Sequence, residues 1–340
     1  MHRIDDPYAV ASLPTPRQPG TPGFFTQGSP TTGQEATIVT DDWANATQEE
    51  LCYVIEQSGI TLSKTDRTQL FQALARLFRR RLTAALTVYV STTGNDTSGD
   101  GLTIATAFAT INRAYTYIRD HIDLNGQQAT IQMEDGTYSS ASLSFPCVGP
   151  AVIIQGNLAD TTRVTVSGVS VPAIATGQGA AVICNSFTVT ATGPGGDYGA
   201  VGAGLLAGSN GQIIFRNMNF GACAQGHIMA YSGGVITCGQ TGVLYTISGG
   251  AQAHVWIDGG VVSIADANVT LSGTPNFANS YVYAMNGGSW MDGWGCTFTG
   301  AATGPRYSVH DNAVVHTHGG GPNYFPGNAV GVTDSGGIYD

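Results

Sequence analysis

The second half of the chain repeats a pattern of apolar and small polar residues. Each copy has a short apolar segment, a turn of small residues and a second apolar segment. The turns centre on Gly211, Gly234, Gly250, Gly288 and Ala313, in steps of 23, 16, 38 and 25 residues. The 38-residue step is close to two ordinary ones. Because one strand–turn unit cannot bury its own apolar face, the repeat predicts stacked coils. Turns of Gly and Asn, which accept positive φ, favour a parallel β-helix over helical repeats.

Composition agrees with a mainly β solenoid and narrows the partners. Gly accounts for 47 of 340 residues and charged residues for only 11%. Lys64 is the one lysine, and beyond residue 125 there are three arginines against ten acidic residues. Since nucleic-acid affinity comes largely from Lys and Arg, we expect no nucleic-acid partner. No apolar run approaches the roughly 20 residues that span a bilayer, so we expect no membrane insertion. Residues 1–33 lack the apolar core of a signal peptide, which predicts synthesis in the host cytoplasm.

The sequence offers little sign of a cofactor. None of the six cysteines forms a C-x-x-C pair, so buried free thiols are expected. Residues 202–207 match the dinucleotide pattern G-x-G-x-x-A, but a strand follows where that site needs a helix. We therefore predict no cofactor.

Five segments are expected along the chain. Residues 1–36 contain six prolines and form an extended arm. Residues 37–85 form a helical hairpin: one helix starts at Asp41 and ends at Gly59, and a second begins near Asp66 and closes on Arg79–Arg81. So thin a core predicts association, with three chains around an axis. Residues 86–150 hold the entry strand and capping helix, residues 151–318 the solenoid body, and residues 319–340 a Gly-rich end.

The entry segment carries a recognisable series of short motifs. They are Val88-Tyr89-Val90-Ser91, Gly94-x-Asp96, Gly99-Asp100-Gly101-Leu102-Thr103 and Ala107-Phe108-Ala109-Thr110-Ile111. This order resembles the entry of pectate-lyase-like right-handed β-helices. The resemblance implies a first strand and a helix, from about Ala107 to Ile122, that closes the end of a right-handed solenoid. The family includes many proteins that are not enzymes, so it carries no catalytic assignment.

Both ends of the chain give a second resemblance. Its motifs are Phe24-Phe25-Thr26-Gln27-Gly28, Asp42-Trp43-x-Asn45-x-x-Gln48-Glu49-Glu50-Leu51 and Gly319-Gly320-Gly321-Pro322-Asn323-Tyr324. They resemble phage tail-fibre proteins. The resemblance implies a virion component and a homotrimer, held to the phage tail or baseplate through residues 1–85.

One pair of carboxylates is a candidate for catalysis. Trp256-Ile257-Asp258-Gly259 and Trp290-Met291-Asp292-Gly293 share a pattern 34 residues apart. If the gap is two coils, the carboxyls lie about 9–10 Å apart, and if it is one looped coil, about 5 Å, which span inverting and retaining glycosidase geometries. The alternative is that each Asp-Gly only makes a turn. The turn is the preferred interpretation, so no catalytic residue is assigned.

His316 and His318 are the metal candidates. Alternate residues of a strand point to one face, so three chains would bring six imidazoles around a trimer axis. The alternative is an exposed strand end that runs into Gly319–Gly321, and it is the preferred interpretation.

These observations predict a structural tail-fibre or tail-spike subunit that is not an enzyme. Its expected work is attachment to a host surface glycan through aromatic and hydroxyl side chains, strengthened by trivalency. Two alternatives stay open: a polysaccharide depolymerase on the same scaffold, and a fibre that only decorates the baseplate.

Overall fold

The chain divides into two compact units in a computed structural model that describes residues 2–193, 202–239 and 242–340. The units are Met1–Arg80 and Arg81–Asp340. The first is helical and the second is a parallel β-solenoid, which confirms the mainly β solenoid predicted from the repeats. In the described parts of the chain, no helix combines the length and apolar character needed to cross a membrane.

The helical unit contains α1 (Asp41–Gln57) and α2 (Gln69–Leu77). Thr40 caps α1 by accepting a hydrogen bond from the Trp43 N–H (3.3 Å). The predicted end of the second helix is wrong, because α2 stops at Leu77 and Arg80–Arg81 form the extended β1. Three consecutive arginines therefore follow the helix without capping it.

Residues 2–40 form no helix and only one isolated antiparallel bridge, between Ser29 and Gln34. Charged side chains tie this segment to α1: the Arg3 guanidinium lies 2.8 Å from both Glu49 and Glu56. Such exposed ion pairs add little stability. The buried apolar side chains of the unit are Cys52, Ile55 and Ala73. The unit therefore has almost no core of its own.

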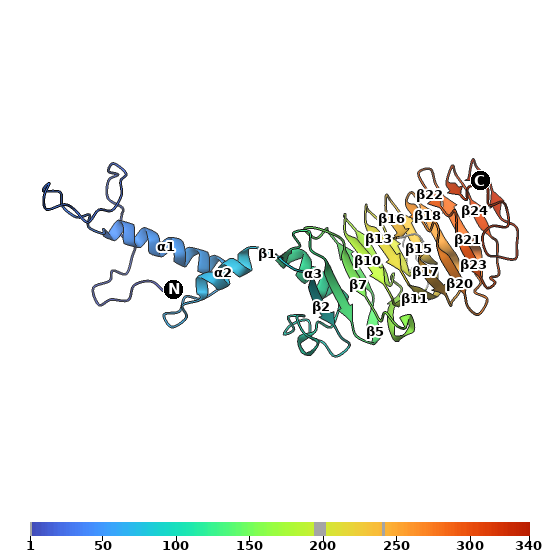
Figure 1. The fold of residues 1–340 in the computed structure, drawn as a ribbon, viewed down its shortest axis with the longest axis horizontal. Helices are drawn as coiled ribbons and strands as arrows, with labels where there is room; N and C mark the ends of the chain where they lie inside the picture. The colour runs from blue at the N-terminus through green and yellow to red at the C-terminus, as the bar shows by residue number, and fades with distance from the viewer. Residues whose placement is uncertain (1, 194–201, 240–241) are drawn as a thin grey trace. The chain divides into compact units, whose positions relative to one another are not determined.

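The solenoid has three parallel sheets, and each complete coil adds one strand to each (Figure 1). The ten-stranded sheet is ordered β2 (Leu86–Val90), β4 (Ala129–Met133), β7 (Val152–Gln155), β10 (Ala181–Asn185), β13 (Gln212–Arg216), β16 (Val235–Cys238), β19 (Val261–Ser263), β22 (Trp290–Asp292), β25 (Val314–His316) and β27 (Ile338–Tyr339).

The other two sheets close the coil. The seven-stranded sheet contains β5 (Gly136–Ser139), β8 (Val164–Val169), β11 (Thr188–Thr192), β14 (Asn219–Cys223), β17 (Leu244–Ile247), β20 (Asn268–Leu271) and β23 (Thr297–Thr299). The eight-stranded sheet contains β6 (Ala141–Ser144), β9 (Ile174–Gly177), β12 (Leu205–Ala207), β15 (Gly226–Tyr231), β18 (Ala251–Asp258), β21 (Phe277–Met285), β24 (Tyr307–Val309) and β26 (Val332–Thr333).

Alternation along each strand sets the interior. In β18, Val255 and Ile257 are buried while Trp256 and Asp258 are only partly so. The same period of two in stacked strands makes one continuous apolar core along the solenoid. Five cysteines lie buried with free thiols, as predicted: Cys52, Cys184, Cys223, Cys238 and Cys296.

The entry motifs have a clear structural cause. The helix α3 (Ile111–His121) begins after Thr110, whose N–H and hydroxyl both donate to the Asp96 carboxylate (3.1 and 2.7 Å). A Cβ at Gly94 would lie 2.1 Å from the Phe108 carbonyl oxygen, so only glycine fits. Buried Ile118 and its neighbours place α3 against the edge strands β2 and β6. The short helices η1 (Ile104–Thr106) and η2 (Thr161–Arg163) and the strand β3 (Ile122–Asp123) complete the fold.

The true repeat differs from the predicted one at its third copy. Register-paired residues begin successive strands of the ten-stranded sheet in steps of 23, 26, 29 and 24, at Gln212, Val235, Val261, Trp290 and Val314. Gly250 is not at this corner, because it lies between β17 and β18. The missing turn is Gly259-Gly260, which precedes β19. The 16- and 38-residue steps arose from choosing a turn at another corner of the coil.

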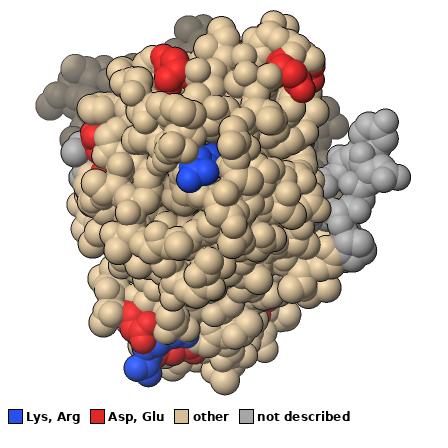
Figure 2. Space-filling model, turned by 90° about the vertical axis from the view of Figure 1, so that its right-hand side faces the viewer, with Lys and Arg blue, Asp and Glu red and all other residues tan. Residues whose placement is uncertain are grey.

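The last strands continue the same sheets. β26 pairs with β24 and β27 pairs with β25, and Phe325 is buried in the core between them in sequence. Residues beyond 318 are thus part of the solenoid. Figure 2 shows an end face of the molecule that is mostly uncharged, with scattered Asp and Glu side chains and few Lys or Arg.

Candidate functional site

The outer face of the eight-stranded sheet carries two neighbouring rows of large side chains. We call them the aromatic strip, made of Met229, Trp256, Tyr283, Ser308, Tyr231, Asp258, Met285 and His310. Met229 pairs with Trp256, and Trp256 with Tyr283, so these side chains stack from coil to coil. Their strand neighbours Val255 and Val282 are buried in the core, which leaves the strip on the outside.

The rings of the strip touch one another. The Trp256 and Tyr283 centroids lie 4.5 Å apart with an angle of 50° between the planes, and Tyr283 lies 5.7 Å from the His310 ring. Burial raises the pKa of the Tyr283 phenol. Trp256 and Tyr283 are half-buried, while Tyr231 is 39% exposed. The strip therefore offers ring faces and edges that are already rigid.

Polar groups beside these rings are held in fixed positions. Asp258 accepts a hydrogen bond from the Asn286 amide (2.6 Å). His310 Nδ1 lies 2.6 Å from Asp334, and its Nε2 lies 2.6 Å from the Ser308 hydroxyl. The hydrogen bond from His310 holds the pKa of the Asp334 carboxyl below its usual value. Rings beside fixed acceptors suit a sugar, whose apolar face stacks while its hydroxyls donate.

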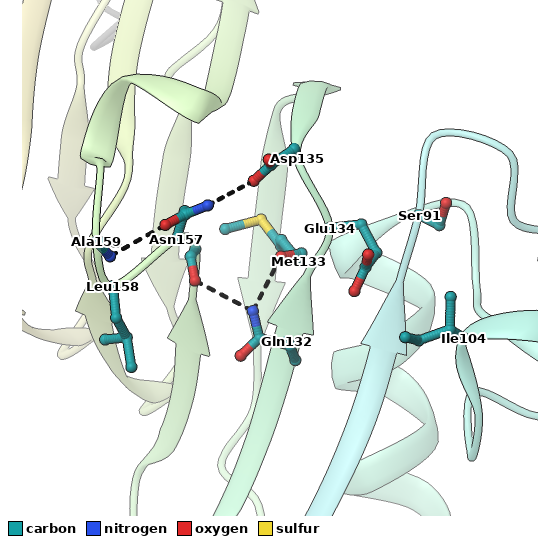
Figure 3. A pocket seen from close by; sticks show the side chains of 10 residues that line it. Ser91, Ile104, Gln132, Met133, Glu134, Asp135, Asn157, Leu158 and Ala159 are labelled. Atoms are coloured by element: carbon teal, nitrogen blue, oxygen red, sulfur yellow. Dashed lines mark hydrogen bonds between the residues drawn. The ribbon is translucent and has the colours of Figure 1, made fainter.

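A second surface feature is a groove of about 710 Å³ (Figure 3). It lies where the parallel strands β2, β4 and β7 end, so Ser91, Gln132, Glu134 and Asn157 reach it from neighbouring coils. The Gln132 amide donates to the Met133 and Gly156 carbonyls (3.0 and 3.1 Å). The groove is therefore a preformed polar surface.

The two carboxylates of this groove have different surroundings. Asp135 accepts from the Asn157 amide (2.8 Å) and from Arg163 (2.6 Å), and these contacts lower its pKa. Glu134 lies beside it, at the turn between β4 and β5 that the sequence predicted. A fixed anionic carboxylate next to a second carboxylate suits a hydroxylated or cationic ligand.

The structure separates Asp258 from Asp292. Asp258 ends β18 in the eight-stranded sheet, and Asp292 ends β22 in the ten-stranded sheet. The estimate of 5 or 9–10 Å assumed equivalent places on stacked coils, and that assumption is wrong. The two tetrapeptides look alike because alternation and a turn recur at two corners of the coil.

Asp292 instead lies next to the predicted histidines. It pairs in register with His316, which ends β25, and His318 follows two residues later. The ring centroids of His316 and His318 lie 4.0 Å apart. Sequence reasoning named all three residues but not their association. It also missed Tyr283 and His310, although the alternation in Phe277–Met285 already marks Tyr283 as outward-facing.

Comparison with known proteins adds one relative. No family model matches the chain, and no solved structure matches it. A stretch of 81 residues is 42% identical to "Uncharacterized protein StfP" of Escherichia coli (strain K12). This stretch is 24% of the present chain and 37% of the relative, so the similarity spans little more than a third of that protein. The class that the fold defines is a parallel β-solenoid protein with a helical amino-terminal unit.

Proposed function

We propose that the protein is a subunit of a phage tail fibre or tail spike that attaches the virion to a host surface glycan. The helical unit is the anchor and the solenoid is the attachment body. In this proposal the protein is a virion component, a homotrimer and not an enzyme.

The observation that carries the proposal is the nearly coreless helical unit. Its apolar side chains are mostly exposed: Phe24, Phe25, Trp43, Tyr53, Phe71, Leu74, Leu77 and Phe78. Phe24 is 98% exposed. Domains this small bury too little surface to be stable alone, so the unit needs other chains against it. Copies of the same chain and a tail or baseplate protein are the proposed partners of residues 1–85.

The aromatic strip is the proposed glycan surface. Its rings supply stacking area at little conformational cost, and Asp258 supplies a fixed acceptor for hydroxyl groups. Binding by one strip is expected to be weak, and three strips on one fibre raise the effective affinity without new contacts.

Host-cell adsorption of the full-length protein tests this assignment. Trp256→Ala should weaken adsorption about tenfold, in line with the loss of one ring from a binding surface. Trp290→Ala is the matched control, because Trp290 is 40% exposed but lies in the ten-stranded sheet. The molar mass of each variant should equal that of the parent trimer.

Two other results would redirect the proposal. If Trp256→Ala lowers the mass to that of a monomer, the strip is the interface between chains and the glycan surface lies elsewhere. If the parent protein shortens the host polysaccharide, the depolymerase alternative holds, and the groove with Glu134 and Asp135 becomes the first place to seek its active site. If it binds neither cells nor glycan, a fibre that only decorates the baseplate is the better account.

A further inference from the structure

Three side chains with metal-binding donors gather at one corner of the solenoid. They are Asp292, His316 and His318, and one donor atom from each lies within 4.8 Å of the other two. Their proximity follows from the fold. Asp292 and His316 are paired residues at the carboxyl ends of the adjacent parallel strands β22 and β25. His318, at a positive φ of 55°, turns back beside them.

One carboxylate oxygen of Asp292 lacks a partner. Asp292 Oδ1 is buried and forms no hydrogen bond with the residues that the structure describes. A buried carboxylate oxygen without a donor is costly, and most such atoms in proteins have a hydrogen bond or an ion beside them. This atom therefore points to a missing cation rather than to a finished turn.

The surroundings of His316 suit a ligand role. Its Nε2 lies 2.9 Å from the Asp340 carboxylate. A neutral imidazole that donates from Nε2 carries its lone pair on Nδ1. A carboxylate behind a histidine is the usual arrangement at metal sites, because it sets the tautomer and the ring orientation. Asp340 is thus the positioning residue of the site.

We propose that Asp292, His316 and His318 of a single chain bind one divalent transition-metal ion of the zinc type. Two imidazoles and a carboxylate favour Zn²⁺ and its first-row neighbours, whereas Ca²⁺ and Mg²⁺ prefer sets of oxygen ligands. Three protein ligands leave a fourth position for water. The ion joins two successive coils, so its role is to hold the carboxyl-terminal part of the solenoid together.

The donors must close by a small movement. Bonds of about 2.0–2.2 Å place tetrahedral ligands nearer to one another than 4.8 Å. His318 is exposed and is followed by Gly319–Gly321, so its ring has room to move toward the other two. The site differs from six imidazoles on a trimer axis, because one ligand is Asp292 and all three ligands come from one chain.

Titration of the metal-free full-length protein with zinc chloride tests the site. Calorimetry should give one zinc per chain, and Asp292→Asn and His318→Gln should each weaken binding at least tenfold. Asp340→Asn should weaken it about tenfold through the orientation of His316. The matched control is His310→Gln, since His310 also contacts a carboxylate, Asp334 at 2.6 Å, but belongs to the aromatic strip. It should bind zinc like the parent.

Cobalt gives a second measurement that does not depend on heat. Trp294 lies 5.4 Å from the His318 ring between centroids, so Co²⁺ bound there should quench its fluorescence. His318→Gln should abolish the quenching, and because His318 is exposed this change is not expected to disturb folding. Magnesium at the same concentration should give no signal.

Three outcomes would overturn the proposal. One is the absence of zinc binding at 100-fold excess over protein. Another is one zinc per three chains with Asp292→Asn at parent affinity, which would place the ion on a trimer axis. The third is equal loss in His310→Gln and His318→Gln, which would mean scattered surface binding. None of these outcomes bears on attachment to a host glycan, so the two proposals fail separately.

Discussion

His227 Nδ1 lies 3.1 Å from His254 Nδ1 in the interior of the solenoid, one coil apart. Both residues are fully buried, and His254 Nε2 lies 3.1 Å from the Tyr245 hydroxyl. Between two Nδ1 atoms only one can donate, so both rings can be satisfied only in the neutral state. Burial lowers the pKa of His227 to about 3 and holds that of His254 well below its ordinary value.

This pair predicts that the solenoid loses stability in acid. Below about pH 6.5 the unfolded chain takes up protons on both histidines and the native chain does not, so folding weakens as the pH falls. Two such groups correspond to a slope of about 2.7 kcal/mol per pH unit, down to about pH 3. The urea midpoint, followed by near-UV circular dichroism, should fall steadily between pH 6.5 and pH 4.

A double variant isolates the two histidines from other acid effects. His227→Leu with His254→Leu should flatten most of the slope, although stability at pH 8 drops about 1–3 kcal/mol because Tyr245 loses its partner. His310→Gln, outside the core, should keep the parent slope. A parent midpoint that is the same at pH 7 and pH 4.5 would contradict this account.

The corner glycines predict a steric difference within one chain. A Cβ at Gly234 would lie 2.1 Å from the Ala207 carbonyl oxygen of the preceding coil. Gly234→Ala should therefore cost about 1–3 kcal/mol of unfolding free energy. At Gly287, on a later coil, the nearest atom to such a Cβ is the Asp311 oxygen at 4.0 Å. Gly287→Ala should be neutral or slightly stabilising in the same urea measurement. Equal effects would mean that the coils are not stacked this closely.

Shortening the chain should separate folding from attachment. A chain that begins at Arg81 keeps every solenoid strand and Leu82, whose side chain is buried in the core and whose N–H donates to Asp123 (2.9 Å). It should give the circular dichroism of the solenoid but fail to join fibreless phage particles. A chain that begins at Leu86 lacks Leu82 and should be about 1.5–3 kcal/mol less stable. Incorporation of either into particles would contradict the assignment of the anchor.

Asp258 and Asp292 provide a test of catalysis. Because they end strands of different sheets, Asp258→Asn with Asp292→Asn should leave host adsorption within about twofold of the parent, with only a small stability cost from altered turn hydrogen bonds. Plaque halos and oligosaccharide release should not depend on them. If the parent releases oligosaccharide and the double variant does not, the carboxylates act together and the attachment account is wrong.

Some features could be read from the sequence because their causes are local. The alternation in β2 and the Gly94-x-Asp96 motif involve only nearby residues, since Asp96 holds the start of the helix that follows it. A turn that needs positive φ favours Gly or Asn wherever it occurs. These signals predicted the solenoid, the entry strand and its helix, although the helix begins at Ile111 and not at Ala107.

The stacking of coils required the tertiary structure. Loops of unequal length separate the strands, so the step between coils varies from 23 to 29 residues and Gly250 resembled a corner to which it does not belong. Register between parallel strands is set by which apolar side chains pack in the shared core, and spacing along the chain does not reveal it. That register placed Asp292 beside His316 and kept it apart from Asp258. The residue types were visible in the sequence, but their neighbours were decided by the packing of one coil on the next.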